Sequence, residues 1–374
     1  MSMNGTLPTP EDIKRVKGTR FPARQNHGGL LHARVITRNG RLQPDEIRAI
    51  VDAAEKFGSG EIAMTTRLTI EVQRIPFANI EPFCAFLAEH GLETGGTGPK
   101  VRPIVACKGT TCQYGLIDTV AFSRTIHERF YKGWHDVRLP HKFKIAVGGC
   151  PNNCVKPDLN DLGIIGQRVP SHDLSKCRGC KVCQIEKACP IGASRLGESR
   201  LDWNEEMCNH CGRCVGKCPF GVVGEEKRGY AVYIGGRWGK RTAQGRMLAH
   251  VFTSEEEVLE VIERALTLFR DEGNAGERFS DTVSQPRLRE RPEPSARQIK
   301  LHKYAAKRHA KSVAVFRLSI KSSESRAYRL SEKTKFFRQS LAAAPFPSRT
   351  LPFFPFKDIF VVRTAHILPH IEQV

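Results

Sequence analysis

The 374-residue sequence predicts an α+β fold built from two α/β regions, the second interrupted by a cysteine-dense segment. Three observations predict this fold. Strand and helix patterns alternate from about Leu30 to Gly91 and again from Val101, twelve of the thirteen cysteines fall between Cys107 and Cys218, and the strand and helix patterns return after them. At this length we expect two or three compact domains.

The first domain, residues 1–92, is predicted to hold two strand–helix units. LLHARVIT is typical of a strand and PDEIRAIVDAAEKFG of an amphipathic helix. EIAMTTRLTIEVQRI predicts one long strand, which carries Arg67, and FANIEPFCAFLAEHG a second helix. Cys84 lies on the apolar face of that helix and is expected in the core. His27 and His32 have no clear partner. The pattern predicts a small sheet with its helices on one face.

The second domain is predicted to comprise residues 93–170 and 224–283, separated by an insertion at 171–223. VRPIVAC, HKFKIAVGG and YAVYIGG are its strands, and its helices run around Thr119 to Tyr131 and over SEEEVLEVIERALTLFRDEG. The insertion has few large aliphatic residues, as expected where inorganic clusters replace an apolar core. The segment IGGRWGKRTAQG predicts either an anion-binding loop of backbone amides or an ordinary turn.

The insertion carries two cysteine runs with the spacing of iron–sulfur ligands. CNHCGRCVGKCP has the spacing C-x2-C-x2-C-x3-C-P, in which three thiolates hold one cluster and the fourth reaches the other. CRGCKVCQIEKACP has a longer last arm. The alternative, a zinc knuckle, usually takes two well-separated pairs. We assign one 4Fe-4S cluster to Cys177, Cys180, Cys183 and Cys218, and the other to Cys208, Cys211, Cys214 and Cys189. The two runs together resemble a bacterial two-cluster ferredoxin.

Two further cysteine pairs each follow a predicted strand of the second domain. ACKGTTCQYG holds Cys107 and Cys112, and GGCPNNC holds Cys150 and Cys154. Such pairs can converge on one more cluster, and a structural zinc is the alternative.

The segments RPIVACKGTTCQYGLIDT and LPHKFKIAVGGCPNNC resemble the sirohaem-binding signature of sulfite and nitrite reductases. The likeness extends from about Leu30 to Val283 and is nearest to the one-chain type found as the catalytic C subunit of anaerobic sulfite reductase. The resemblance implies a ferredoxin-like half-domain, a sirohaem and 4Fe-4S α/β domain, and an inserted 2x4Fe-4S ferredoxin module. It also implies that Cys154 bridges the third 4Fe-4S cluster to the sirohaem iron.

The same resemblance implies four basic residues that bind the substrate and the cofactor: Arg67, Arg102, Lys142 and Lys144. Sulfite carries close to two negative charges and sirohaem bears several carboxylates, so a site for both needs cationic donors. Lys142 and Lys144 lie two apart on a predicted strand and therefore point to one face. A solvated charged surface is the alternative interpretation for these lysines and for Arg67.

The formal net charge of +20 would suit a nucleic-acid-binding protein, but the charge is unevenly placed. Residues 291–374 contain 17 Lys and Arg against 5 Asp and Glu, which gives +12 and leaves +8 for residues 1–290. We therefore expect no nucleic-acid partner. Residues 284–374 are predicted to be a basic tail, disordered or atypical in structure.

No stretch approaches the roughly 18 to 20 consecutive apolar residues of a membrane span, and the N-terminal residues lack the apolar core of a secretory signal. We expect a soluble cytoplasmic protein without a membrane span, whose thiols stay reduced.

The predicted function is the six-electron reduction of sulfite to sulfide, with electrons supplied by a donor protein or reductase subunits. The alternatives are a sirohaem nitrite reductase and a non-catalytic iron–sulfur electron-transfer subunit. A hetero- or homo-oligomer stays open.

Overall fold

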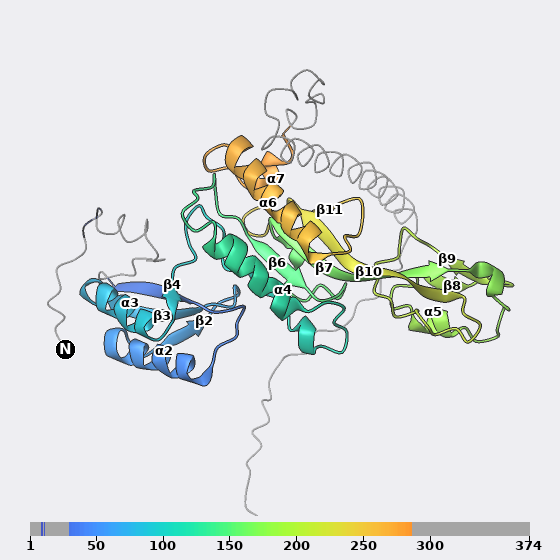
Figure 1. Ribbon diagram of the computed structural model, residues 1–374, viewed down its shortest axis with the longest axis horizontal. Helices are drawn as coiled ribbons and strands as arrows, with labels where there is room; N and C mark the ends of the chain where they lie inside the picture. The colour runs from blue at the N-terminus through green and yellow to red at the C-terminus, as the bar shows by residue number, and fades with distance from the viewer. Residues whose placement is uncertain (1–8, 10, 12–29, 286–374) are drawn as a thin grey trace, which may run out of the picture. The chain divides into compact units, whose positions relative to one another are not determined.

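The structure is a computed structural model that describes Thr9, Glu11 and residues 30–285 (Figure 1). Most of the predicted basic tail, and His27, lie outside the described residues. No helix within the described part of the chain is long and apolar enough to cross a membrane.

The first sheet has four strands in the order β2-β3-β1-β4, and all neighbours are antiparallel. The strands are β1 (Leu30–Ile36), β2 (Ile62–Met64), β3 (Ile70–Pro76) and β4 (Glu93–Thr94). Helices α2 (Pro44–Phe57) and α3 (Ile80–Glu89), the latter preceded by the 3-10 turn η1 (Phe77–Asn79), share one apolar core with this sheet. Both helices therefore cover one face of the sheet, and Cys84 packs against the same core, as predicted.

The prediction of one long strand over residues 61–75 is wrong, because a turn separates β2 from β3. The hydroxyls of Thr65 and Thr69 lie 2.7 Å apart, and the backbone N–H of Leu68 donates to the Thr65 carbonyl at 3.0 Å. Leu68 takes a left-handed φ of 56°. Threonine side chains that bond locally compete with a strand ladder. The segment is consequently a hairpin, and Arg67 lies in its turn rather than on a strand.

The second sheet has five strands in the order β11-β10-β7-β6-β5. Strands β5 (Val105–Ala106), β6 (Ile145–Gly148) and β7 (Leu162–His172) run parallel, whereas β10 (Val223–Ile234) pairs antiparallel with β7 and with β11 (Arg246–Met247). Two predicted strands are shorter than expected: β5 covers only the end of VRPIVAC, and β6 begins after the lysines of HKFKIAVGG. Isolated pairing of Val101 with Phe143 continues the parallel alignment before these strands.

Helices close the core of this second sheet. They are α4 (Thr119–Ile126) with its π-helical continuation η3 (His127–Lys132), the long α6 (Glu255–Glu272) and the short α7 (Phe279–Thr282). Ser254 caps α6 in a capping box with Glu257. The rings of Phe143 and Phe279 pack with centroids 5.0 Å apart, so α7 lies directly over the segment that leads into β6.

Between β7 and β10 the chain leaves the sheet and forms a small separate core. It contains the turn η5 (Leu174–Lys176), the helix α5 (Gln184–Ala188), and the hairpin of β8 (Ser194–Leu196) and β9 (Leu201–Trp203) (Figure 1). Because β7 and β10 pair from Leu162 with Ile234 to His172 with Val223, the segment departs from the end of one continuous hairpin.

Candidate active site and cysteine clusters

Four cysteines gather at the carboxyl ends of β5 and β6, where parallel strands bring their following loops together. Cys107 follows β5 and Cys150 follows β6, while Cys112 ends the turn η2 (Gly109–Thr111) and Cys154 precedes the turn η4 (Pro157–Leu159). Burial raises the pKa of Cys150, and the nearby thiols of the other three raise it further. Four thiols this close need a multivalent cation to stay ionised together.

The loops that carry these cysteines meet backbone to backbone. The N–H of Gly149 donates to the Cys107 sulfur at 3.1 Å. A Cβ on Gly149 would lie 2.8 Å from the Gly109 Cα, so glycine is required for this approach. Backbone N–H donors to cysteine sulfur are typical of iron–sulfur sites, and these residues fit a cluster.

A second group of cysteines lines one cavity within the insertion: Cys189, Cys208, Cys211 and Cys214. Trp203 also lines the cavity, and its indole N–H points to the thiol of Cys208, for which this hydrogen bond lowers the pKa against the opposing effect of burial. Burial and the neighbouring thiol of Cys208 raise the pKa of Cys214 to about 11. The four thiols and the indole N–H directed at one of them fit an iron–sulfur cluster, whose cysteine sulfurs accept hydrogen bonds.

The remaining cysteines of the insertion lie around its apolar core. Cys177, Cys183 and Cys218 pack against it, and Cys180 is exposed. The guanidinium of Arg178 stacks over the Phe220 ring at 4.5 Å, which holds the two cysteine runs together. Among the described residues, no group of three or more His, Cys, Asp or Glu side chains could hold a single metal ion.

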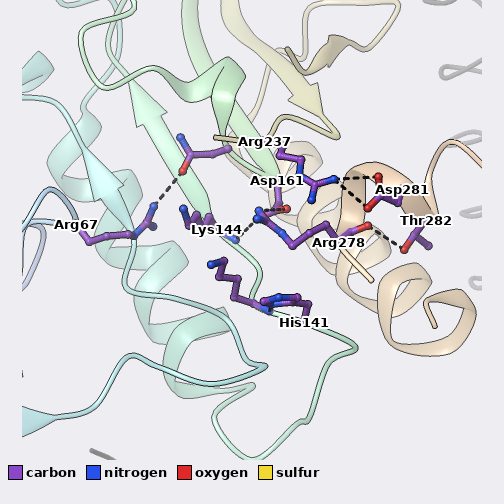
Figure 2. A network of polar contacts seen from close by, with 10 residues as sticks. Arg67, His141, Lys144, Asp161, Arg237, Arg278, Asp281 and Thr282 are labelled. Atoms are coloured by element: carbon purple, nitrogen blue, oxygen red, sulfur yellow. Dashed lines mark hydrogen bonds and ion pairs between the residues drawn. The ribbon is translucent and has the colours of Figure 1, made fainter. Parts of the chain in front are cut away.

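Basic side chains converge beside β6 (Figure 2). Arg67 extends from the β2–β3 turn, and its guanidinium donates to Asn160 Oδ1 at 3.0 Å and to the carbonyls of Ile145, at 3.2 Å, and Pro103. Burial and the nearby Arg102 lower the pKa of Arg67 to about 9, so it is still a cation at neutral pH. Arg67 therefore joins the first domain to the second.

Arg102 and the two lysines complete this group. Arg102 donates to the Gly96 carbonyl at 2.9 Å, and burial lowers its pKa to about 10. Lys142 and Lys144 flank the fully buried Phe143, so their side chains share the opposite face, although β6 itself begins one residue later. Burial, Arg67 and Lys142 lower the pKa of Lys144 to about 8. All four basic residues that the sequence indicated thus lie in one positive field.

The structure adds residues that sequence reasoning missed. Arg278, at the start of α7, donates to both carboxylate oxygens of the fully buried Asp161, at 2.9 and 3.0 Å. The Nε–H groups of Arg67, Arg102 and Arg278 are buried without a partner among the described residues. Neither Lys142 nor Lys144 forms an ion pair with any described residue. Orphaned cationic donors of this kind fit a polyanionic cofactor and an anionic substrate.

The IGGRWGKRTAQG segment after β10 is a closed turn. The backbone N–H groups of Arg237 and Ala243 each donate to the other's carbonyl, at 2.8 and 2.9 Å. The side chains of Arg237, Arg241 and Arg246, together with α7, line a cavity of about 280 Å³. The anion-binding loop of backbone amides stays a prediction, and Arg237 and Arg241 of the segment lie at the cavity.

The α+β fold and the cysteine groups indicate an iron–sulfur protein. The model of the nitrite and sulphite reductase 4Fe-4S domain matches residues 97–286, and that of the nitrite/sulfite reductase ferredoxin-like half domain matches residues 23–90. The chain belongs to the nitrite and sulphite reductase family.

Several known proteins are similar to this chain. The coenzyme F420-dependent sulfite reductase of Methanocaldococcus jannaschii is 34% identical over 233 residues, 62% of this chain and 36% of the relative. This chain thus spans about a third of that relative. The C subunit of the anaerobic sulfite reductase of Salmonella typhimurium is 29% identical over 270 residues, 67% of this chain and 74% of the relative. A crystal structure of dissimilatory sulfite reductase I shares the fold, with a TM-score of 0.54 and 21% identity over 68% of this chain and 66% of that one.

Proposed function

We propose that this chain reduces sulfite to sulfide at a sirohaem coupled to a 4Fe-4S cluster, and that two ferredoxin-type clusters in residues 171–223 deliver the electrons. The observation that carries the proposal is the arrangement around β5 and β6. Arg67, Arg102, Lys142 and Lys144 lie at the amino ends of these strands, and four thiols gather in the loops at their carboxyl ends. A site that reduces a dianion needs both cationic donors and a redox centre.

The cysteines have distinct roles in this proposal. Cys107, Cys112, Cys150 and Cys154 would hold the catalytic cluster, and Cys154 would also hold the sirohaem. The exposure of Cys154 is consistent with that second ligation. The cofactor pair, when bound, would supply electrons to the substrate one at a time.

The basic residues bind and orient the anion. Arg67 is fixed by three acceptors, so its guanidinium does not reorganise when charge develops on the substrate. The Lys144 ammonium, with a pKa of about 8, holds a proton at neutral pH that it can give up at modest cost. Each oxygen that leaves sulfite as water consumes protons, and a lysine in this range suits that supply.

One contact supports the proposed electron route. The guanidinium of Arg213, between Cys211 and Cys214, lies 4.4 Å from the ring of Tyr114, two residues after Cys112. This contact joins the cavity of Cys189, Cys208, Cys211 and Cys214 to the loop of the catalytic cluster. It supports a route in which that ferredoxin-type cluster is the nearer of the two to the active site.

The experiment is anaerobic steady-state turnover with a viologen reductant and either sulfite or nitrite. We expect a Soret band that sulfite perturbs, and a higher kcat/KM with sulfite. Nitrite reduction is the second candidate, because the matching family model covers both activities. A higher kcat/KM with nitrite would replace sulfite by nitrite in the proposal. A brown protein with no porphyrin-type bands would reduce the chain to an electron-transfer subunit.

A further inference from the structure

We propose that the buried pair of Asp161 and Arg278 keeps the Lys144 ammonium available for anions, which makes Arg278 a positioning residue of the site. The inference rests on the proposed function. Figure 2 shows Arg278 reaching Asp161 from the start of α7, with Lys144 on the other side of the carboxylate.

The Asp161 carboxylate is fully buried, and it accepts hydrogen bonds from two residues. Arg278 Nη2 donates to both oxygens, and the backbone N–H of Lys144 donates to Oδ2 at 2.9 Å. The carboxylate thus holds the main chain of Lys144 while the ammonium of that residue makes no ion pair among the described residues. The Leu162 N–H donates to the Lys144 carbonyl at 3.1 Å and fixes the same stretch from the other side.

The charge balance explains why Arg278 is needed. Asp161 raises the pKa of Arg67, Lys142 and Lys144, because its negative charge stabilises their charged forms. Neighbouring cations lower the pKa of each of these three residues. A buried carboxylate demands a cation. After Arg278, Lys144 is the cation whose charge favours the ionised Asp161 carboxylate. We therefore expect Lys144 to pair with Asp161 when Arg278 is removed, and a lysine paired in this way is withdrawn from the substrate.

Arg278 is held in place by its own segment. Its carbonyl accepts from the backbone N–H groups of Asp281 and Thr282, at 2.9 and 3.1 Å, and Asp281 pairs with Arg237 at 3.0 Å. The next residue, Phe279, is fully buried against Phe143, which lies directly before Lys144. The arginine and the lysine are therefore positioned by one packed unit.

The test compares Arg278→Gln with the double variant Asp161→Asn/Arg278→Gln in the full-length protein. Brief acetylation with acetic anhydride at pH 8, followed by mass spectrometry, reports the fraction of Lys144 that is neutral, relative to the exposed Lys56. In Arg278→Gln, pairing with Asp161 raises the pKa of Lys144, and we expect acetylation to slow by about tenfold. The double variant removes the carboxylate as well and should return the rate to within about twofold of wild type.

The sulfite KM provides a second readout, with an expected rise of about tenfold in Arg278→Gln and recovery in the double variant. A purely structural role predicts that the double variant is no better than the single one, and this result would overturn the inference. Arg278→Lys keeps a cation beside Asp161 and should leave the acetylation rate and the sulfite KM near their wild-type values. This variant still tests the inference if Arg278→Gln does not fold. Acetylation of Lys144 that slows in Arg278→Lys as much as in Arg278→Gln would contradict us.

Arg129→Gln is the matched control. Arg129 also binds two carboxylates, Glu256 and Glu263 at 2.9 Å each, but on the exposed surface. It should leave Lys144 acetylation unchanged. Acetylation requires no turnover, so the two proposals can fail separately. If Lys144 acetylation changes as predicted but the protein does not reduce sulfite, the proposed function alone is refuted. If Lys144 acetylation is unchanged in Arg278→Gln, the pairing of Lys144 with Asp161 alone is refuted.

Discussion

Lys144 lies half-buried beside Arg67 and Lys142, and its burial and these cations make its ammonium easier to deprotonate than that of an ordinary lysine. The site holds it in this state because the nearby carboxylate of Asp161 is occupied by Arg278. An anion that enters the site relieves the repulsion among the cations. In the proposed site, a bound anion would therefore favour protonation of Lys144.

The pH dependence of sulfite binding follows from this arrangement. The pKa of Lys144 is lowered to about 8, so the ammonium is present below that pH and is lost as the pH rises through it. We expect sulfite affinity to fall on an alkaline limb that begins at or above pH 8. In Lys144→Arg, whose side chain stays charged, this limb should disappear from a pH series of KM. An unchanged limb would show that another group titrates.

Arg67 provides a test of geometry as opposed to charge. Arg67→Lys keeps the positive charge but loses the planar fork that contacts Asn160, Pro103 and Ile145. We expect kcat/KM for sulfite to fall by about 10²-fold. Arg129→Lys is the surface control and should stay within twofold of wild type. Equal kinetics for Arg67→Lys and wild type would remove Arg67 from the binding site.

At the residue scale, sequence reasoning could indicate the cysteines, because their spacing is short and specific. It could not indicate Arg278, since its partner Asp161 is 117 positions away and no local pattern marks either residue. The placement of Arg67 on a strand was wrong for a local reason: alternation of polar and apolar residues continues through the threonines that close the turn.

At the scale of elements, most residues of the proposed site lie on turns and loops rather than on strands. The hairpin turn after β2 carries Arg67, the loops after β5 and β6 carry four cysteines, and Arg278 directly precedes α7. Strand and helix patterns predicted these elements well where they are long, as for α2 and α6. The predicted length of β5 was too great, because the apolar residues before it are buried but do not form a continuous ladder of strand hydrogen bonds.

The cysteine loop of the insertion depends on contact with β7. The backbone N–H of Arg168 donates to the His210 carbonyl at 2.8 Å, and a Cβ on Gly212 would lie 2.5 Å from the Arg168 Cδ. Gly212 and Gly216 share a left-handed φ, at 66° and 73°, but nothing lies within 4 Å of a Cβ on Gly216. An alanine at Gly216 therefore introduces backbone strain alone, whereas an alanine at Gly212 introduces the same strain and a clash with Arg168.

We expect Gly216→Ala to cost about 1 kcal/mol of folding free energy and to retain its iron. Gly212→Ala adds the clash with Arg168 and should lose iron from the cluster nearest β7. Iron and sulfide analysis with thermal unfolding would measure both effects. Equal iron content in the two variants would contradict the proposed docking of this loop.

At the scale of the whole molecule, the chain combines the proposed anion site with an insertion that departs from one hairpin. Because His172 pairs directly with Val223, residues 173–222 can be replaced by Asn-Gly, which favours the type I′ turn of a two-residue hairpin. The sequence alone could predict the insertion, because a cysteine-rich segment interrupts the alternating pattern of strands and helices. The direct pairing of β7 with β10 required the structure.

The shortened chain tests whether the insertion serves electron delivery only. We expect it to keep the Soret band and the iron of one cluster, and to lose reduction by a protein donor while small viologens still reduce the haem. Loss of the Soret band in a folded shortened chain would show that the insertion is also needed to hold the tetrapyrrole.

The most direct test of the account is chemical analysis of the full-length protein, prepared anaerobically with sirohaem available, alongside Cys154→Ser. The account predicts about twelve cluster irons, three clusters of four, and one sirohaem per chain, with sirohaem lost or spectrally altered in Cys154→Ser. A wild-type protein that contains only the eight or so irons of two ferredoxin-type clusters and no tetrapyrrole would contradict it.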